Sequence, residues 1–489
     1  MNYSEFEALA KQGNVIPVYQ TYLADLLTPV SAFLRLTQAS KNAFLFESVE
    51  GGEKTARFSF LGCDPFCTIQ FSENTIEEMR LGKRERFKSD IFEHLKKLFG
   101  NYKMARLENL PRFTGGAVGY FGYETIHLIE DVPVLQNGSQ TFPEAAFMLF
   151  DTILAFDHLK HQIYIIKNVR LDEESGSLPK LFEHAQATIS GIKQRLDCEL
   201  NRIKNDRSVE DSRVESNFNA ADFCSAVSRA KEFIQAGDIF QVVLSQQFRR
   251  KISATPFDIY RALRIINPSP YLYFIKMDDK CIIGSSPELL VRVENRKIEV
   301  RPIAGTRKRG QTPAEDSELM ADLEQDPKEV AEHTMLVDLG RNDVGQVSEF
   351  GSVEVTEFMQ VEKYSHVMHL VSNVQGKLRE NLTAIDALKA CFPAGTVSGA
   401  PKIRAMEIIS ELEPEKRGVY AGALGYLDFS GNLDTCIAIR TILTENKHAY
   451  FQAGAGIVAD SVPESEYHET MHKSAALREA IDFAERGLK

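Results

Sequence analysis

The sequence predicts an α+β fold in which antiparallel strands dominate. Three observations support this: most predicted strands follow one another through short turns, the helical segments between them are amphipathic, and no internal repeat is visible. Short connections favour antiparallel neighbours, because a parallel pair needs a long crossover. The 489 residues suggest one large or two to three ordinary domains, and 43% hydrophobic and 26% charged residues are normal for a soluble protein.

Before residue 193, strands and helices alternate. A polar turn at 50–53 separates the first two predicted strands, and a helix is expected at 89–99 from its apolar spacing. Glycines at 115–123 alternate with apolar and aromatic residues, which predicts closely packed strands rather than a phosphate loop. The strands expected in this part are 44–46, 57–61 and a hairpin over 153–169.

The composition shifts in residues 193–219, where charged residues and asparagine dominate. We interpret this stretch as a charged linker between an N-terminal subdomain, 1–192, and a second subdomain, 220–489. The second part is expected to contain helices at 221–236 and about 464–486, and strands at 240–248, 271–277, 281–285, 289–293 and 297–301.

Bulk properties exclude several classes of protein. The net charge of −12 argues against nonspecific nucleic-acid binding. The sequence contains no run of about 18 apolar residues, so no membrane helix is expected. Residues 1–12 lack the apolar core of a signal peptide. Seven scattered cysteines, with no second pair to complete a zinc site beside Cys63 and Cys67, indicate free thiols in a reducing cytoplasm.

Two pairs of glutamates are the most informative feature: Glu329 with Glu332, and Glu466 with Glu469. Each pair follows a helix-start signal, Asp326-Pro327 or 461–463, and residues three apart share one helix face. If the two helices face each other, four carboxylates converge, and a hard cation such as Mg²⁺ would offset their repulsion. Two solvated helix faces would give the same spacing. The first helix is expected to end near Gly340.

Other polar clusters each have two interpretations. Backbone amides could bind an anion in three stretches: the basic stretch 301–310, the small-residue stretch 452–458 and the loop 393–402. The alternatives are a solvated loop at 301–310, tight strand packing at 452–458 and a buried helix start at 393–402. Lys473 lies on the stripe of Glu466 and Glu469, where it could bind a ligand anion or form an ordinary ion pair. His366 and His369 fall in a predicted strand at 364–374, on opposite faces.

Taken together, these motifs resemble component I of anthranilate synthase, in the chorismate-utilising enzyme family. The resemblance covers nearly the whole chain and is strongest at 302–306, 332–343, 367–371, 392–396, 454–456 and 460–469. It implies a large, mostly antiparallel β-sandwich with helices packed outside, and a 220–489 subdomain that binds chorismate. It also implies conversion of chorismate and ammonia to anthranilate, pyruvate and water with Mg²⁺, the first committed step of tryptophan biosynthesis.

The resemblance assigns a role to each site position. Glu332 and Glu469 match direct metal ligands, and Glu329 and Glu466 match outer carboxylates behind them. His369 matches the histidine beside the departing 4-hydroxyl, and Thr396 lines the same site. The positions matching substrate contacts are Gly305, Thr306, Tyr420, Arg440, Gly454, Ala455, Gly456 and Lys473.

Two positions discriminate among the relatives. Water-using isochorismate and salicylate synthases carry a lysine where this chain has Gln241, which favours ammonia as the nucleophile. The 4-amino-4-deoxychorismate synthases often carry a lysine where this chain has Ala304, which favours amination at C2. A synthase that stops after amination remains the alternative, and an inactive subunit that only senses tryptophan is a third hypothesis.

Feedback inhibition by tryptophan is also implied. The matching residues are Glu47, Ser48, Asn267, Pro268, Pro270, Tyr271 and Leu272. The chain shows no glutaminase domain, so a separate glutamine amidotransferase subunit is expected to supply ammonia in a hetero-oligomer, while free ammonia at raised pH should also serve. Tryptophan itself is missing from the chain, which fits an enzyme needed when tryptophan is scarce.

Overall fold

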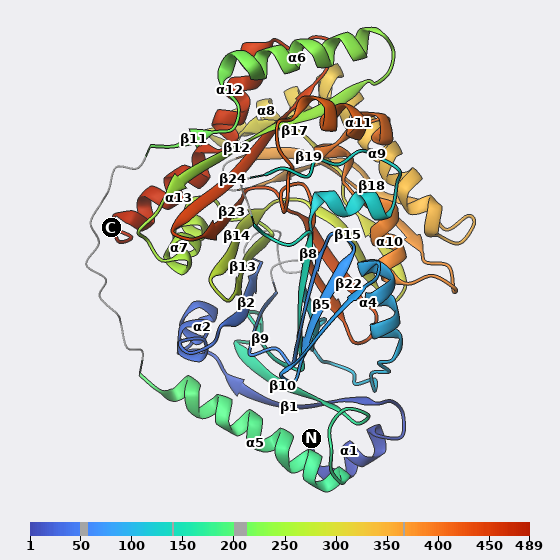
Figure 1. The fold of residues 1–489 in the computed structure, drawn as a ribbon, viewed down its shortest axis with the longest axis vertical. Helices are drawn as coiled ribbons and strands as arrows, with labels where there is room; N and C mark the ends of the chain where they lie inside the picture. Colours follow the sequence, from blue (N-terminus) through green and yellow to red (C-terminus); the bar gives the residue numbers. More distant parts are fainter. Residues whose placement is uncertain (49–56, 139–140, 200–212, 365–366) are drawn as a thin grey trace.

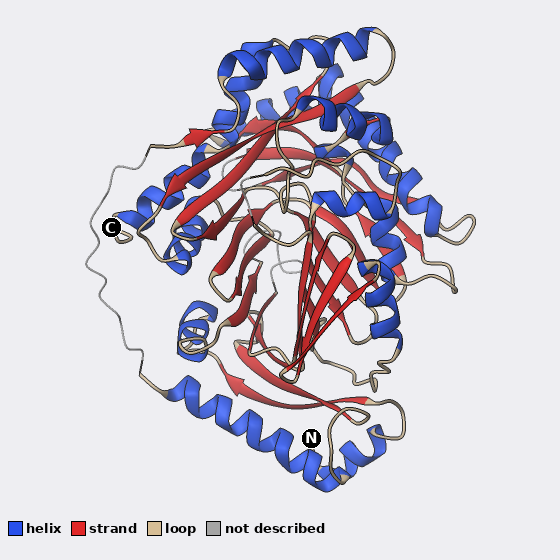
Figure 2. Ribbon diagram, in the orientation of Figure 1, coloured by secondary structure: helices blue, strands red, loops and turns tan. Residues whose placement is uncertain are grey.

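Two twelve-stranded sheets, whose ladders are antiparallel, form the centre of this computed structural model (Figures 1 and 2). The structure describes residues 1–48, 57–138, 141–199, 213–364 and 367–489. The turn expected at 50–53 lies outside these residues. The antiparallel fold predicted from the short connections is confirmed.

Sheet A contains strands from both ends of the chain. In spatial order they are β1 (Val15–Leu23), β10 (Gln162–Arg170), β9 (Thr152–Asp157), β3 (Phe58–Cys63), β2 (Asn42–Glu47), β13 (Tyr271–Met277), β14 (Lys280–Ser286), β23 (Thr441–Glu445), β24 (His448–Ile457), β12 (Gln241–Lys251) and β11 (Glu215–Ser216), with β20 (Gly399–Ala400) also on β12. The hairpin expected at 153–169 is β9 and β10.

Sheet B is built the same way. Its order is β17 (Ile303–Lys308), β19 (Val367–Lys377), β16 (Lys297–Val300), β15 (Leu289–Glu294), β22 (Leu433–Ile437), β21 (Ala423–Asp428), β7 (Gly116–Phe121), β8 (Ala145–Phe150), β4 (Cys67–Ser72), β5 (Thr75–Arg80) and β6 (Lys83–Lys88), with β18 (Glu354–Lys363) also on β19. In β7, a Cβ on Gly119 would lie 2.0 Å from the carbonyl oxygen of Ala146, so the glycine-rich stretch is a closely packed strand, as predicted.

The helices cover the outer faces of the two sheets (Figure 2). Their bounds are α1 (Tyr3–Leu9), α2 (Pro29–Leu36), α4 (Ile91–Gly100), η1 (Tyr123–Leu128), α5 (Leu178–Asp197), α6 (Ala220–Gln235), α7 (Pro256–Ile266), α8 (Pro313–Gln325), α9 (Pro327–Val347), α10 (Ala384–Cys391), η2 (Gly395–Val397), α11 (Lys402–Leu412), α12 (Pro463–Lys473) and α13 (Ala475–Glu485).

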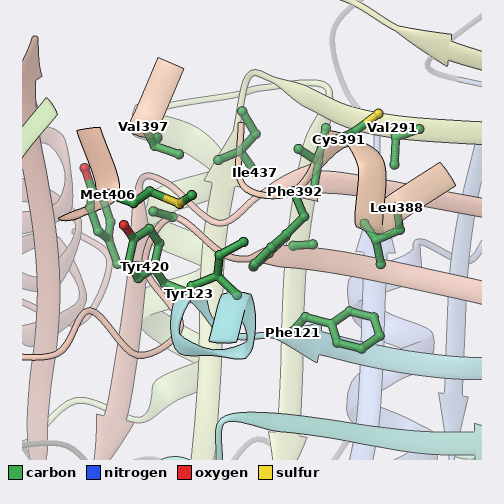
Figure 3. Packing of buried hydrophobic residues seen from close by; sticks show 14 of the residues in the cluster. Phe121, Tyr123, Val291, Leu388, Cys391, Phe392, Val397, Met406, Tyr420 and Ile437 are labelled. Atoms are coloured by element: carbon green, nitrogen blue, oxygen red, sulfur yellow. The ribbon is translucent and has the colours of Figure 1, made fainter. Parts of the chain in front are cut away.

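The three largest apolar clusters of the described residues fill the layers. One joins the inner faces of the sheets, with Phe44 and Tyr273 from sheet A against Tyr120 and Tyr426 from sheet B. A second packs sheet A against α1, α2, α5, α7 and α13. The third packs sheet B and the β12–β24 end of sheet A against α4, α6, α9, α10 and α11, and it includes Tyr420 (Figure 3). Together these clusters fix where the site residues stand.

The two proposed subdomains share both sheets. In sheet A, β2 pairs with β13, and in sheet B, β7 pairs with β21, so in each sheet a block of strands from before residue 193 joins a block of strands from later in the chain. Of the expected linker, residues 193–197 belong to α5, 215–216 form β11, and 200–212 lie outside the described residues. The division into 1–192, 193–219 and 220–489 stays a prediction.

Two helix predictions were wrong. α9 continues past Gly340 to Val347, because Gly340 lets the helix pack against sheet B: a Cβ there would lie 3.2 Å from Val300. The final helix is two helices, since Ser474 separates α12 from α13 and its hydroxyl donates to the carbonyl of Met471 at 2.8 Å. Serine hydroxyls that bond to the preceding turn often bend helices.

All seven cysteines are free, as expected, although Cys198 is exposed. In the part of the chain that the structure describes, no helix has the length and apolar character needed to cross a membrane.

Candidate active site

A cavity of about 390 Å³ lies where β12 and β24 of sheet A, β17 and β19 of sheet B, α9 and α12 meet. We call it the central cavity. Of the positions predicted for substrate or metal, those lining it are Thr306, Glu332, His369, Thr396, Tyr420, Arg440, Gly454, Gly456, Glu466, Glu469 and Lys473. Gly305, Glu329 and Ala455 do not line it. Both glutamate-bearing helices therefore contribute to one cavity, with three of the four glutamates in its lining.

α9 carries the first glutamate pair and begins as the sequence predicts. The Asp326 side chain accepts the N–H groups of Lys328 at 2.9 Å and Glu329 at 3.3 Å, and Pro327 occupies the first turn. α12 also starts at a proline, Pro463, but without a side-chain cap. Residues three apart on each helix then face the same side.

The carboxylates in the central cavity repel one another. Burial raises the pKa of Glu332, and the charges of Glu329 and Glu469 raise it further. The pKa of Glu466 is raised by burial and by Glu469. Two cations of the chain oppose this: Lys328 and Lys473 lower both pKa values.

Two of the four carboxylates have cationic partners of their own. Glu329 accepts from Arg307 at 3.0 Å, and Glu469 forms an ion pair with Lys473 at 2.6 Å. Within the described ranges, no group of three or more His, Cys, Asp or Glu side chains is arranged to hold a metal ion. The donor chemistry nevertheless fits a hard divalent cation, because oxygen ligands that repel each other across one cavity are those that Mg²⁺ or Ca²⁺ prefers.

His369 lines the cavity from β19, where burial favours the uncharged imidazole. Burial lowers its pKa, although a hydrogen bond to the carbonyl of Gly305 opposes the shift. Its Nδ1 lies 2.9 Å from that carbonyl oxygen and 3.1 Å from the hydroxyl of Thr306. Since a carbonyl only accepts, we assign the proton to Nδ1, which leaves Nε2 as an acceptor. His366 lies outside the described residues.

Part of the cavity wall is cationic. Burial lowers the pKa of Arg440, which Glu288 partly restores, and Lys473 donates to the carbonyl of Gly454 at 3.1 Å. A Cβ at Gly454 would lie 2.8 Å from the Tyr420 hydroxyl. A side chain there would collide with Tyr420 and crowd Leu244 and Val243, which explains the need for glycine. Such a wall suits a ligand with carboxylate groups.

Glu288 is a cavity residue that the motif analysis missed. It follows β14 and precedes β15, and the Thr396 hydroxyl donates to its Oε1 at 2.9 Å. Burial raises its pKa to about 7, against the lowering effects of Thr396 and Arg440. A glutamate between Pro287 and two leucines, at the junction of two apolar strands, was the available signal. Lys328 and Gln452, which also line the cavity, gave no such signal.

A second, smaller pocket of about 40 Å³ lies between the two sheets. Of the residues predicted to bind tryptophan, it is lined by Glu47, Ser48, Pro270, Tyr271 and Leu272. Pro268 and Asn267 do not line it. Asn267 instead caps the end of α7, and its side-chain oxygen lies 3.5 Å from Nη1 of Arg440 in the central cavity.

Known proteins match this chain over almost its whole length. The profile of the family described as "chorismate binding enzyme" matches residues 41–479. Anthranilate synthase component 1 of Acetivibrio thermocellus is 51% identical over 98% of each chain. That of Pseudomonas aeruginosa is 45% identical over 100% of both.

Solved structures show the same fold. Anthranilate synthase component I from Streptococcus pneumoniae superimposes with a TM-score of 0.79 at 40% identity, over 94% of this chain and 99% of that one. The isochorismate synthase MenF from Escherichia coli gives 0.71 at 17% identity, over 98% of each chain, which shows the shared fold. The chain therefore belongs to the chorismate binding enzyme family and, within it, to the anthranilate synthase component I proteins.

Proposed function

We propose that the chain converts chorismate and ammonia into anthranilate and pyruvate, with Mg²⁺ bound in the central cavity. One observation carries the proposal: three carboxylates, Glu332, Glu466 and Glu469, share a cavity with Arg440 and Lys473. A dicarboxylate ligand needs cationic groups on the cavity wall to bind its carboxylates. It also needs a bound cation to offset the negative charge of the three glutamates. The names of the relatives support the choice of chorismate as this dicarboxylate.

The charged residues of the central cavity determine how chorismate would bind. Arg440 can hold one carboxylate by a fork of two hydrogen bonds, with Lys473 and the amides beside Gly454 and Gly456 nearby. Glu332 and Glu469 would hold the metal, with Glu329 and Glu466 behind them. Bound there, the metal would supply positive charge to the ring carboxylate.

The chain's own residues handle the departing 4-hydroxyl. Glu288, with a pKa of about 7, retains a proton near neutral pH and can donate it as the C4–O bond breaks and water leaves. Thr396 fixes the carboxyl by its hydrogen bond. Neutral His369 orients the hydroxyl through Nε2. Loss of the ring proton and of the enolpyruvyl group as pyruvate then leaves the aromatic amine.

The nucleophile is ammonia rather than water. Gln241 lines the cavity and cannot act as a base, so a nucleophile that needs no deprotonation is favoured. Ala304, also at the cavity, cannot attack the ring. The alternative product, 4-amino-4-deoxychorismate, would result if ammonia formed its bond to C4 as the C4–O bond broke, and if the reaction stopped there with the enolpyruvyl group retained.

We infer that a separate glutamine amidotransferase supplies the ammonia in the cytoplasm, and that tryptophan inhibits the enzyme. The relatives are named component 1, which supports a second component. Tryptophan would bind the smaller pocket, where Glu47 can hold its ammonium group.

Product analysis tests the proposal. The purified chain, incubated with chorismate, MgCl₂ and ammonium salt at raised pH, should release fluorescent anthranilate and pyruvate in equal amounts. Omitting ammonium or adding EDTA should stop the reaction, and excess Mg²⁺ should restore it after EDTA. Isochorismate or salicylate would refute the argument from Gln241, a non-aromatic amine without pyruvate would support the alternative, and tryptophan binding without turnover would indicate a regulatory subunit.

A further inference from the structure

Arg417 is a charged residue buried directly behind the central cavity. Its exposed fraction is 1%, and that of its partner Glu413 is 5%. Nε of Arg417 donates to Oε2 of Glu413 at 2.9 Å, and Nη2 donates to Oε1 at 2.6 Å. This fork satisfies both charges in a place that water does not reach, where an unpaired charge would be costly.

The same guanidinium holds two segments of the cavity wall by their backbones. Nη1 donates to the carbonyl of Val397 at 2.6 Å, and Nη2 donates to the carbonyl of Val243 at 2.7 Å. Val243 belongs to β12 and Val397 to η2, next to Thr396, and all three line the cavity. Both carbonyl oxygens are thereby turned toward Arg417 and away from a ligand that carries negative charge.

Glu413 extends the network to a third wall residue. It accepts from the N–H and the hydroxyl of Ser245, each at 2.8 Å, and Ser245 Oγ accepts from Nε2 of Gln452 at 2.8 Å. Because the Ser245 hydroxyl gives its hydrogen to the carboxylate, Gln452 must be the donor, which fixes its amide orientation. Its Oε1 has no partner within the described residues.

A fourth contact is made by an aromatic ring. The guanidinium lies 5.7 Å from the ring centre of Tyr420, whose hydroxyl stands beside Gly454. A planar, permanently charged guanidinium can stack on a ring while it binds carboxylate and carbonyl oxygens; a lysine ammonium cannot cover all of these at once.

We propose that Arg417 is a positioning residue for the substrate: it sets the floor of the cavity, formed by Val243, Val397, Tyr420 and Gln452, without touching the ligand. The role rests on the proposed binding of chorismate in this cavity. Its loss would free two carbonyl oxygens toward the cavity and release η2 with Thr396.

The decisive variant must separate positioning from stability. Arg417→Met alone leaves the Glu413 charge buried and unpaired, which destabilises the protein whatever its role. R417M/E413Q removes both charges, and the glutamine oxygen still accepts from Ser245. The matched control is R170M: Arg170 is 4% exposed and bonds to Asp151 and Glu173, neither of which lines the cavity.

We expect R417M/E413Q to unfold within about 3 °C of the unchanged protein, while kcat/KM for chorismate falls at least tenfold, mostly through a higher KM. Hydrogen exchange at the amide of Val243, which donates to the carbonyl of Ser398 at 2.9 Å, should become faster, since it reports the contact between β12 and η2. R170M should lose stability but keep both kinetic constants. R417K, which retains the charge, should lie between.

Unchanged kcat/KM together with unchanged exchange at Val243 would overturn the proposal. If R417M/E413Q does not fold, R417K decides by the same two measurements. Should the unchanged protein fail to turn over chorismate, the proposed function fails, whereas the exchange measurement still decides whether Arg417 holds the cavity wall.

Discussion

Glu288 illustrates how burial gives a single carboxyl a proton to donate. Its pKa of about 7 lies well above the usual range, because removal from water disfavours the charged form. A proton donor with this pKa is active below about pH 7 and loses its proton as the pH rises. Activity that depends on the acid form should therefore fall as the pH rises, whereas activity that depends on a general base falls as the pH drops.

The pH dependence of kcat/KM for chorismate, normalised to free ammonia, tests this role. We expect a fall above about pH 7 in the unchanged protein, because kcat/KM reports the free enzyme. Glu288→Gln should lower kcat at least 100-fold and abolish this limb. Thr396→Val removes a hydrogen bond that lowers the pKa, so it should move the limb to higher pH. A Glu288→Gln enzyme that retains the limb would contradict the assignment.

Single glutamates in the central cavity should also set the affinity for the proposed Mg²⁺. Glu469→Gln should raise the Mg²⁺ concentration for half-maximal activity at least tenfold, since one anionic ligand is lost from the cavity. Glu464 lies on the same helix but is exposed and does not line the cavity, so Glu464→Gln is the control. Isothermal titration calorimetry with Mg²⁺ measures the metal affinity of both variants. Equal affinities in the two variants would show that α12 does not bind the metal.

The sequence predicted those site residues that carry a local pattern. Glu332 and Glu469 could be found because helix starts and a spacing of three fix which way a carboxylate points. Glu288 could not be assigned in this way: burial raises its pKa while Thr396 and Arg440 lower it, and both of these residues lie more than 100 residues away in the chain. Such environments arise only when distant strands meet.

At the scale of the element, starts of helices were predicted better than ends. Asp326-Pro327 opens α9 because a capping carboxylate and a proline satisfy the first turn locally. Gly340 did not end the helix, because the helix needs a small residue where it crosses sheet B. The division at Ser474 likewise depends on a hydrogen bond that propensity does not encode.

Asp326 links the start of α9 to the proposed metal site. Its Oδ1 caps α9 and its Oδ2 accepts from Arg307 at 2.7 Å. Asp326→Ala should lower the free energy of unfolding by about 1 kcal/mol, measured by urea titration, as for other lost N-caps. It should also weaken Mg²⁺ binding by loosening Glu329 and Glu332.

Asp326→Asn is the matched control. An asparagine oxygen still caps the helix, so stability should be almost unchanged while the ion pair with Arg307 is lost. If both variants were equally destabilised, the ion pair rather than the cap would hold the start of α9.

At the scale of the whole molecule, the sequence predicted antiparallel sheets but not their order. The pairings of β2 with β13 and of β7 with β21 join residues more than 200 apart, and no local pattern encodes them. These pairings also make the protein one structural unit: the smaller pocket and the central cavity are both built from sheet A and sheet B.

One helix spans the distance between the two pockets. Glu47 accepts from the hydroxyl of Tyr260 at 2.5 Å and pairs with Arg264 at 3.0 Å, and both partners belong to α7. The same helix ends at Asn267, 3.5 Å from Arg440. A ligand ammonium at Glu47 would compete with Arg264, and any resulting shift of α7 would reach Arg440, the cation that we propose binds the substrate. Inhibition requires such a difference in affinity between two states.

Glu47→Gln should therefore desensitise the enzyme to tryptophan. Loss of a charge-assisted hydrogen bond, about 1.5–3 kcal/mol, predicts a rise of roughly 10- to 100-fold in the tryptophan concentration for half inhibition. The kcat and KM for chorismate without tryptophan should change less than about twofold, because Glu47 does not line the central cavity. Glu445→Gln is the control, since Glu445 is equally buried in sheet A but does not line the smaller pocket. An E47Q enzyme with unchanged inhibition would place the tryptophan site elsewhere.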